Sequence, residues 1–472
     1  MFLQSMEIQG YRGFQQKQEI KFAIPKQDSV TEVSGLTIIT GSNNTGKSSI
    51  IECLKAREGY NPPSFPNGVR NSLIDKVQIE YLFDGGCKEI LMSVHKNSSE
   101  TKFEGTRCEK KIFVVPSRRA FEPYFSKSEL DRESYILNTA FQAKRSSLLD
   151  YFAYRLFSIE KNEDIKINFN NMLEKVLGFI PEWAIDQSEI GQHFLKFTSG
   201  QNSHSSNGMG EGIVSIFVIV DALYDSKPGD IIAIDEPELS LHPSLQKRLS
   251  KLFVEYAKDR QIIISTHSPY FVDINALAKG AALVRVISSD NGTIIYQLSS
   301  SSTNLIVRLA NNLHNPHTWG LDAREFFFQE DGIILVEGQE DVLLYPKIAK
   351  QLGKEIQGSF FGWGAGGAGN IRHLCSIAKD LGFKRVAAIL DGDKKGCFED
   401  LKTEFSEYHF EIIPADDIKT KPACKATPEK PGLLDKDKDK DKDLVLQSQY
   451  FEAMNSIVDN LNGYLQDEGT HC

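Results

Sequence analysis

The first stretch of the chain alternates short apolar runs with polar or glycine-containing turns. Three of these runs, MEIQGYRGF, QEIKFAI and LTIIT, are rich in residues that favour β-strands. The next segment, KSSIIECLKARE at 47–58, spaces its apolar residues as a helix does. We therefore expect the N-terminal region to begin with strands and to place a helix soon after the LTIIT strand.

The periodicity changes further along the chain. Apolar residues recur every three or four positions on one helix face: Leu148, Phe152, Leu156 and Ile159. This pattern predicts a helical insertion over about 128–197. A polar, glycine-rich passage at 198–212 then precedes a second region of strands and helices that extends to about residue 300.

A serine-rich segment, SSSSTN at 299–304, marks a change of composition, and we place a domain boundary there. Beyond it strands and helices alternate, which predicts a small parallel sheet. The predicted strands lie near 333–336, 358–361, 386–390 and 410–413. The chain is thus expected to be an α/β protein with a first domain at 1–304, a linker helix at 305–330 and a second domain at 331–472.

Two further patterns lie near the C-terminus. The segment DKDKDKDKD at 435–443 alternates charge without an apolar face, so we interpret it as a solvated loop. The last segment has an apolar stripe at helical spacing, which we assign to core packing rather than to a partner-binding face. The stripe consists of Phe451, Met454, Ile457, Val458, Leu461 and Leu465.

Composition limits the class of protein. The 472 residues carry a net charge of −10, and no apolar run approaches the roughly 20 residues that a membrane span needs. No basic segment followed by an apolar one marks the N-terminus for secretion, so we expect a cytoplasmic protein without membrane contact. The seven cysteines are scattered and contain no CxxC pair, which indicates neither a disulfide framework nor a zinc site. Any contact with nucleic acid would depend on local basic patches.

The stretch GSNNTGKS at 41–48 fits the GxxxxGK[ST] phosphate loop and lies between a predicted strand and a predicted helix, as that motif requires. Gly41 and Gly46 would let the backbone wrap the phosphates. Lys47 would reach the β- and γ-phosphates, and Ser48 would ligate Mg²⁺. The sequence therefore predicts an ATP site, formed by Gly41, Asn43, Asn44, Gly46, Lys47, Ser48 and Ser49 together with the two acids described next.

Two later apolar strands end in polar residues suited to the same site. IIAIDEPE at 231–238 ends in two carboxylates. Asp235 would hold the Mg²⁺ with its water shell, and Glu236 would orient the attacking water. IIISTHSP at 262–269 ends at His267, whose imidazole would sense the γ-phosphate, although a strand-end histidine taken alone is more often a hydrogen-bonded surface group.

The order of these motifs resembles the ATP-binding-cassette type of ATPase found in the structural-maintenance-of-chromosomes and recombination-repair families. In that resemblance LSLHP at 239–243 matches the D-loop, and SSNGMGEG at 205–212 takes the position of the signature loop but departs from the usual LSGGQ. Such ATPases close two heads around ATP, so the resemblance implies at least a homodimer. VVPSRR at 114–119 falls in the Q-loop region, where Arg118 and Arg119 would contact phosphate or DNA or would simply lie on the surface.

Two apolar runs in the C-terminal region also end in acids. They are IILVEGQEDV at 333–342 and AAILDGDKKG at 387–396. If the two strands are parallel neighbours, Glu337, Asp391 and Asp393 gather at the sheet edge where α/β proteins bind ligands. Bound Mg²⁺ or Mn²⁺ would relieve the repulsion between these carboxylates, because hard divalent ions take oxygen ligands. The alternative is that the acids only cap the helices that follow.

A glutamate at one strand end and DxD at the next resemble the Toprim fold of topoisomerases, primases and several nucleases. The resemblance implies that Glu337 is the metal-linked or general acid–base carboxylate. It implies that Asp391 and Asp393 ligate metal and that Asp341, one helical turn beyond Glu337, supports them. The loop GWGAGGAGN at 362–370 resembles the glycine turn that approaches this edge in Toprim domains.

An ABC-type P-loop ATPase domain with a helical insertion, followed by a Toprim domain, resembles the overcoming-lysogenization-defect family of nucleases. The resemblance implies an ATP-binding, metal-dependent DNA endonuclease in which ATP sets the geometry of a homo-oligomer. Within IPADDIKTKP at 413–422 it implies a lysine that assists the transition state, Lys421 first and Lys419 second. It further implies a role in bacterial anti-phage defence, with a partner such as a reverse transcriptase and its small nucleic acid, or a helicase.

Two other functions remain open at this point. A regulatory or scaffold ATPase would use its heads to hold and release a partner and would keep a structural metal at the Toprim-like edge. A recombination-repair ATPase would clamp DNA without cutting it. Neither needs a second metal cluster, so the combination of Glu337 with the DxD pair favours the nuclease. Nucleotide-dependent release of a partner without cleavage of DNA would favour the regulatory ATPase.

Overall fold

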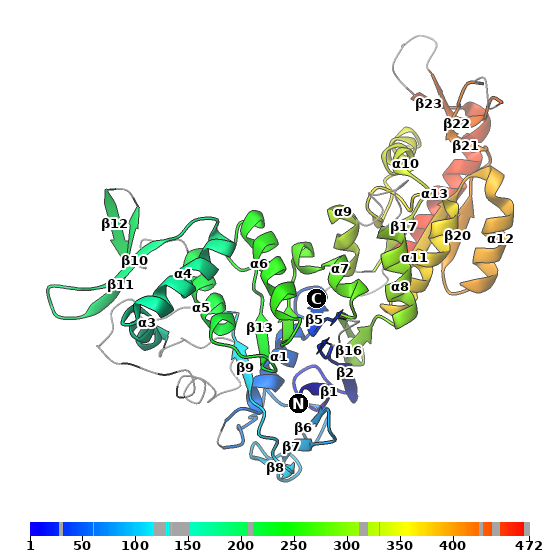
Figure 1. The fold of residues 1–472 in the computed structure, drawn as a ribbon. Coiled ribbons are helices and arrows are strands. Elements are labelled where there is room, and N and C mark those ends of the chain that lie inside the picture. The colour runs from blue at the N-terminus through cyan, green and yellow to red at the C-terminus, as the bar shows by residue number, and fades with distance from the viewer. Residues whose placement is uncertain are drawn as a thin grey trace. The chain divides into compact units, whose positions relative to one another are not determined.

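The computed structural model describes most of the chain. The described residues are 1–27, 32–59, 61–117, 129, 131, 134, 152–199, 201–205, 211–310, 320–329, 331–423, 428–436 and 444–466 (Figure 1). The chain divides into two compact units, Met1–Gln297 and Leu298–Cys472. Within the described residues, no helix is long and apolar enough to cross a membrane.

The first unit contains a six-stranded sheet that carries the predicted phosphate loop. Its strands, in order across the sheet, are β16 (Gly292–Gln297), β15 (Ala282–Ser289), β5 (Leu36–Thr40), β14 (Gln261–Ser265), β13 (Ile231–Asp235) and β9 (Ile112–Val115). All neighbours are parallel except β16, which is antiparallel to β15. Every residue of β5, β13 and β14 is buried, as expected for central strands covered on both faces.

A second, antiparallel sheet in the same unit covers the helix that follows the phosphate loop. Its order is β2 (Gln18–Lys21), β1 (Leu3–Gln9), β6 (Gln78–Phe83), β7 (Lys88–Ser93) and β8 (Thr101–Gly105). Helix α1 (Lys47–Ala56) is buried along its whole length and shares one apolar core with strands of both sheets. The hydroxyl of Tyr81 in β6 donates to the carbonyl oxygen of Cys53 in α1 at 2.6 Å, which ties the helix to this sheet. A short pair, β3 (Lys26–Gln27) and β4 (Glu32–Val33), completes the strands of this region.

The predicted insertion is helical only in part. Helices α3 (Phe152–Glu160) and α4 (Glu163–Leu177) agree with the prediction, and Phe152, Leu156 and Ile159 are buried, while Leu148 lies outside the described residues. The prediction is wrong for 182–197, because β10 (Glu182–Gln187), β11 (His193–Ser199) and β12 (Asn202–Ser205) form an antiparallel sheet there. The alternation of buried Leu195 and Phe197 with less buried neighbours is the period-two pattern of a strand.

Three helices of the first unit lie side by side. Helix α4 packs against α5 (Glu211–Tyr224) and α6 (Pro243–Tyr256), as Figure 1 shows. Further along the chain come the short helices η2 (Pro269–Phe271) and α7 (Ile274–Ala278). Helix α5 precedes β13 in the sequence and α6 follows it.

The segment SSSSTN, where we expected the domain boundary, lies at the start of a helix. The unit boundary lies just before it, after Gln297, and 300–304 form the first turn of α8 (Ser300–Ala310). Serine is a good residue at a helix start because its side chain accepts from the backbone. The hydroxyl of Ser299 accepts from the N–H of Ser302 at 3.2 Å, which explains why this serine-rich run starts a helix.

The second unit is built on a four-stranded parallel sheet, which confirms the predicted strands to within one or two residues. The order is β18 (Ser359–Phe360), β17 (Ile333–Leu335), β19 (Val386–Leu390) and β20 (His409–Ile412). The remaining helices of the unit are α9 (Leu321–Arg324), η3 (Glu325–Phe327), α10 (Gln339–Gln351), α11 (Ala368–Asp380), η4 (Gly392–Lys394), α12 (Lys395–Glu404), η5 (Ser448–Tyr450) and α13 (Phe451–Leu465). The α/β fold class is confirmed for both units.

A small sheet and the last helix complete the second unit. The small sheet contains β21 (Asp417–Lys419), β22 (Gly432–Lys436) and β23 (Leu444–Leu446). The predicted stripe of α13 is buried in the core of this unit, except for Phe451, which is 46% exposed at the helix start. Asp435 and Lys436 of the charge-alternating segment belong to β22, and 437–443 lie outside the described residues.

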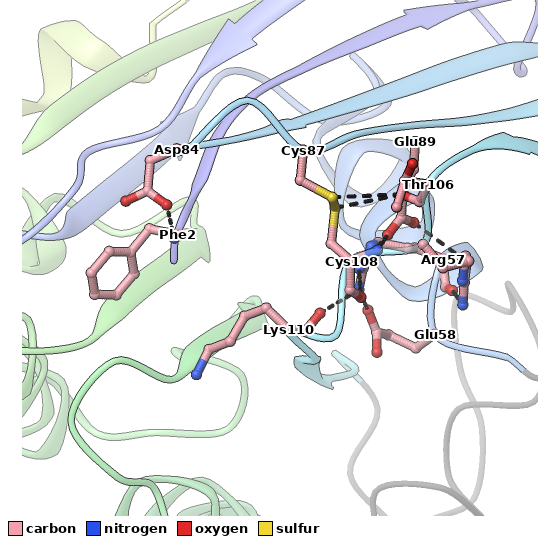
Figure 2. Close-up of a disulfide and its surroundings, with 10 residues drawn as sticks. Phe2, Arg57, Glu58, Asp84, Cys87, Glu89, Thr106, Cys108 and Lys110 are labelled. Carbon is pink, nitrogen blue, oxygen red and sulfur yellow. Dashed lines mark hydrogen bonds and ion pairs between the residues drawn. A yellow bond between two sulfur atoms is a disulfide. The ribbon is translucent and has the colours of Figure 1, made fainter.

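One expectation about cysteine is wrong. Cys87 and Cys108 form a disulfide (Figure 2). It links the residue just before β7 to the segment that follows β8. Beside it, the buried guanidinium of Arg57 pairs with Glu58 at 2.6 Å and with Glu89 at 2.7 Å. The N–H of Cys108 donates to the same Glu89 carboxylate. A single pair of cysteines 21 residues apart forms no recognisable spacing motif, so the sequence pattern did not reveal it.

Candidate functional site

The phosphate loop lies between β5 and α1, and its two glycines occupy positions that other residues would not fit. Gly41 has φ of +138° and Gly46 has φ of +108°, in a region that side chains disfavour. A Cβ on Gly41 would overlap the carbonyl oxygen of Val286 in β15, and one on Gly46 would meet Thr293 in β16 at 3.0 Å. The loop therefore packs closely against β15 and β16. In the phosphate-loop motif, backbone amides of such a loop surround the phosphates.

The other predicted residues of the loop fall into two groups. Asn43 and Asn44 are exposed, and Asn44 has a positive φ of 61°. Lys47, Ser48 and Ser49 are buried at the first turn of α1. The ammonium of Lys47 donates to the carbonyl oxygens of Gly41 at 2.9 Å and Ser42 at 2.5 Å. This lysine thus lies across the loop, close to where the motif places the phosphates.

Strand β14 brings together the remaining residues of the predicted ATP site, because it lies between β5 and β13. The hydroxyl of Ser265, at the end of β14, donates to the buried carboxylate of Asp235 at the end of β13. Glu236 has a positive φ of 47°, and its Oε1 lies 3.6 Å from Nε2 of His267. The structure therefore places Asp235 and Glu236 at the end of β13 and His267 beyond the end of the adjacent β14, which in turn neighbours the strand β5 that leads into the phosphate loop.

Glu238 is a residue of this site that the sequence analysis did not select. Its carboxylate accepts from the hydroxyl of Thr266 at 2.8 Å and from the N–H of His267 at 2.5 Å. Burial raises its pKa, and those hydrogen bonds oppose the rise. Glu238 thus fixes the turn that presents His267. The sequence could have indicated Glu238, because it is a third acid in DEPE, two positions after Glu236.

The predicted D-loop and the start of α5 are in contact within the chain. The hydroxyl of Ser240 donates to Glu211 at 3.1 Å, and a Cβ on Gly212 would overlap the carbonyl oxygen of Ser240. Residues 206–210 of the predicted signature loop lie outside the described residues, as do Arg118 and Arg119 of the predicted Q-loop region.

In the second unit the acids at two strand ends lie next to each other. Strands β17 and β19 are parallel neighbours; Glu337 lies two residues beyond the end of β17, and Asp391 follows β19 directly. The backbone N–H of Asp391 donates to Oε1 of Glu337 at 3.2 Å. The Glu337 side chain therefore points toward the DxD turn, as ligands of a shared site must.

Glycines allow two loops to approach this edge closely. A Cβ on Gly364 would lie 2.7 Å from Cα of Gly338, so the GWGAGGAGN loop touches the backbone just after Glu337. The N–H of Gly367 donates to the carbonyl oxygen of Glu337 at 2.8 Å. Between the two aspartates, a Cβ on Gly392 would overlap the carbonyl oxygen of Ala415, which already accepts from the N–H of Gly392 at 2.8 Å. The predicted role of the glycine loop as a close-approach turn agrees with these contacts.

The acids at this edge affect one another strongly. Burial, followed by repulsion from Glu337, Asp341 and Asp417, raises the pKa of Asp391 to about 8. Burial, followed by the charges of Glu337 and Asp417, raises the pKa of Asp341 to about 6, although a hydrogen bond from the N–H of Gly338 lowers it. That bond, at 2.8 Å, makes Asp341 a cap for the start of α10. Burial also raises the pKa of Glu337.

Asp393 has different surroundings. Burial raises its pKa, but hydrogen bonds from Lys394 and Lys430 outweigh this and lower it. Nζ of Lys394 lies 2.9 Å from Oδ1, and Nζ of Lys430 lies 2.9 Å from Oδ2. Among the residues that the structure describes, no three His, Cys, Asp or Glu side chains are placed to hold a metal ion in this arrangement. The carboxylates thus lie at one edge, with Asp393 engaged by lysines.

The predicted lysines, Lys419 and Lys421, form ion pairs with acids other than Glu337, Asp391 and Asp393. Lys421 contacts Asp417 at 2.6 Å and Glu340 at 3.8 Å, and Lys419 pairs with Glu340. Two residues that the sequence analysis did not select, Asp417 and Lys430, join the cluster. The Asp417 side chain is 5% exposed, so it is an internal acid rather than a surface one. Its position in the ADDIK stretch gave no periodic signal that separated it from Asp416.

The donor set fits a hard divalent ion. Glu337, Asp341, Asp391 and Asp393 offer only carboxylate oxygens, the ligand type that Mg²⁺ and Mn²⁺ prefer. The pKa of Asp391 is raised first by burial and then by the neighbouring carboxylates, and a bound cation would compensate that negative charge. The phosphate loop fits ATP for a comparable reason, because its glycines leave room for phosphates and Lys47 supplies positive charge.

Comparison with known families gives two matches. Residues 36–273 match the family described as "AAA domain, putative AbiEii toxin, Type IV TA system". Residues 327–393 match "Overcoming lysogenization defect protein-like, TOPRIM domain". The first match covers half of the chain and contains the phosphate loop, Asp235 and His267. The second ends at Asp393 and contains Glu337 and Asp391.

Individual proteins are also similar. The OLD nuclease of Thermus scotoductus is 27% identical over 219 residues, which are 42% of this chain and 40% of that protein. Endonuclease GajA of Bacillus cereus is 26% identical over 220 residues, 44% of this chain and 35% of that protein. The chain thus spans about two fifths or less of the length of these two relatives. The Septu protein PtuA of Bacillus thuringiensis is 24% identical, covering 53% of this chain and 70% of PtuA.

Solved structures of SMC head domains are also similar to the chain. One, an SmcHead bound to the C-terminal winged-helix domain of ScpA, has a TM-score of 0.42 and 14% identity, covering 64% of this chain and 99% of that one. The SMC head domain from Thermotoga maritima has a TM-score of 0.37.

Proposed function

We propose that the chain is an ATP-binding, divalent-metal-dependent DNA endonuclease of the overcoming-lysogenization-defect type. It belongs by residues 36–273 to the family described as "AAA domain, putative AbiEii toxin, Type IV TA system", and residues 327–393 match the OLD-like TOPRIM domain. The observation that carries the proposal is the pairing of two strand ends. Glu337 accepts from the N–H of Asp391 at 3.2 Å, two residues before Asp393. Two relatives are named nuclease and endonuclease, which supports the same activity here.

The proposed catalytic residues are Glu337, Asp391, Asp393 and Lys421, with Asp341 in support. The four acids would hold Mg²⁺ or Mn²⁺. When bound, such ions supply an activated water and stabilise the leaving 3′ oxygen of a phosphodiester. Glu337 accepts or donates the proton at this edge, since its buried carboxylate has a raised pKa. Asp417 holds the ammonium of Lys421 within the cluster, so Lys421 can act on the scissile phosphate after a change of rotamer.

In the first unit, the proposed ATP site consists of the phosphate loop with Lys47, Ser48 and Ser49, together with Asp235 and Glu236. Ser48 and Asp235 would hold the Mg²⁺ of ATP, and Ser265 fixes the Asp235 carboxylate for that role. Glu236 would orient water, and His267 would respond to the γ-phosphate beside it. Closing of two heads around ATP would form a homodimer or higher homo-oligomer and so control access of DNA to the second unit.

Defence against phage is the biological role that we propose for this activity. The similarity to GajA and to the Septu protein PtuA supports it. A partner, such as a reverse transcriptase with its small nucleic acid or a helicase, would deliver the trigger. Loss of phage restriction in both Lys47→Ala and Asp391→Ala cells is expected, and full restriction in both would contradict this role.

The test is cleavage of supercoiled and linear DNA by the purified chain in Mg²⁺ or Mn²⁺, with and without ATP. Metal-dependent cutting that EDTA abolishes and that Glu337→Gln lacks is the expected result. If neither DNA is cut under any of these conditions, while nucleotide still controls binding of a partner protein, the regulatory ATPase replaces the nuclease.

A further inference from the structure

Both oxygens of the Asp393 carboxylate are engaged by ammonium groups. Lys394, the next residue in the chain, contacts Oδ1 at 2.9 Å, and Lys430 contacts Oδ2 at 2.9 Å. The carboxylate itself is only 32% exposed, so solvent screens these contacts incompletely. A cation that binds Asp393 must therefore approach against two positive charges that are already there.

Lys430 differs from Lys394 because it comes from a segment far from Asp393 in the sequence. Its backbone forms a bridge with Lys421, with reciprocal N–H to carbonyl hydrogen bonds of 3.0 and 2.9 Å, just before β22. This bridge ties the main chain of Lys430 to that of Lys421. The ammonium of Lys430 therefore reaches Asp393 from a main chain held by this bridge. The two residues are 37 positions apart in the sequence (430 − 393 = 37).

A second acceptor for Lys430 is already in place. Oδ2 of Asp417 lies 3.5 Å from the same ammonium that contacts Asp393 at 2.9 Å. A small movement would thus transfer Lys430 from Asp393 to Asp417 without leaving its charge uncompensated. Asp417 is buried and also holds Lys421, so it remains in position when Lys430 moves.

From these contacts we infer that the ammonium of Lys430 is a tethered cation that closes the proposed metal site in the metal-free protein, and that metal binding requires its transfer from Asp393 to Asp417. The inference rests on the metal site of the proposed function. It assigns to Lys430 a positioning role, since the lysine sets how readily Asp393 becomes a ligand.

Binding of Mn²⁺ tests this inference directly. The EPR signal of free Mn²⁺ is titrated with the full chain, in the absence of DNA and nucleotide, for wild type, Lys430→Met and Lys395→Met. Each variant loses one positive charge, and Lys395 is an exposed residue at the start of α12, two positions after Asp393. Among the described residues, Lys430 forms an ion pair with Asp393 and Lys395 does not. We expect Lys430→Met to bind Mn²⁺ roughly tenfold more tightly than wild type and Lys395→Met to differ from wild type by about twofold or less.

Two further variants identify the site and the cause. Lys430→Arg keeps the tethered charge, so its Mn²⁺ affinity is expected to stay near that of wild type. Asp393→Asn combined with Lys430→Met is expected to lose the gain. Equal affinities for Lys430→Met and Lys395→Met, or a gain that persists without Asp393, would overturn the inference. Because no DNA is present, the result does not depend on whether the chain cuts DNA.

Discussion

The main-chain N–H of Asp391 donates to the carboxylate of Glu337 at 3.2 Å, and this bond joins the ends of two parallel strands that are 54 residues apart in sequence. Burial raises the pKa of Asp391, and the negative charges of Glu337, Asp341 and Asp417 raise it further. The proposed nuclease centre therefore stores electrostatic repulsion when no cation is bound.

Asp391→Asn should stabilise the metal-free protein while it removes activity. The substitution eliminates one of several buried, mutually repelling carboxylates but keeps the backbone N–H that Glu337 accepts. A gain of about 1 kcal/mol would raise the melting temperature of a unit of this size by roughly 2–4 °C in EDTA. Thermal unfolding of wild type and Asp391→Asn measures the shift. Asp416→Asn, at an exposed position nearby, is the control, and a lower melting temperature for Asp391→Asn would contradict the account.

Gly392→Ala should disrupt the same edge. The added methyl group would overlap the carbonyl oxygen of Ala415, so the DxD turn must move away from the segment that leads to Asp417. Metal-dependent cleavage is expected to fall at least roughly tenfold, as misplacement of a reacting group commonly costs. Gly396→Ala is the matched control, because nothing lies within 4 Å of its Cβ position in α12. Equal activity in both variants would show that close approach at Gly392 is not needed.

Lys47→Ala should abolish the stabilisation of the first unit by Mg²⁺-ATP. Lys47 lies across the loop on the carbonyl oxygens of Gly41 and Ser42, and no other residue of the loop carries positive charge. The thermal shift with nucleotide is expected in wild type and in the control Lys251→Ala, at an exposed position of α6. For Lys47→Ala we expect the affinity for nucleotide to fall at least roughly tenfold, so that no thermal shift is seen. A wild-type shift in Lys47→Ala would place ATP elsewhere.

Reduction should destabilise the first unit. The disulfide closes a loop over a separation of 21 residues, which contributes on the order of 3 kcal/mol by restricting the unfolded chain. Dithiothreitol is therefore expected to lower the melting temperature of wild type. The double variant Cys87→Ser with Cys108→Ser should melt near the reduced wild type and should not respond to dithiothreitol. Cys397→Ser, which removes a free thiol, should behave as wild type does.

Sequence pattern alone was sufficient for features that have local periodicity or a fixed motif. The strands that end at Glu337 and Asp391 are uniformly apolar, and α/β alternation implies that such strands are parallel, so their acids could be placed at one edge. The phosphate loop was equally clear, because strand, glycines and helix follow each other directly.

Features that depend on tertiary contacts could not be predicted in this way. Lys430 reaches Asp393 from the bridge before β22, and no spacing rule connects those two residues. Asp417 differs from Asp416 only in burial, which the sheet β21–β22 determines. The disulfide likewise depends on the register of the β6–β7–β8 strands, which brings Cys87 to Cys108.

The measurement that tests the central claim most directly is relaxation of supercoiled plasmid in Mn²⁺ by wild type, Asp391→Ala and Asp416→Ala side by side. The two variants remove an acid from the same edge of the second unit, but only Asp391 is buried against Glu337. The account predicts cutting by wild type and Asp416→Ala, and a loss of at least roughly 10²-fold in Asp391→Ala. Cutting by Asp391→Ala at the wild-type rate would show that the strand-end acids are not the nuclease centre.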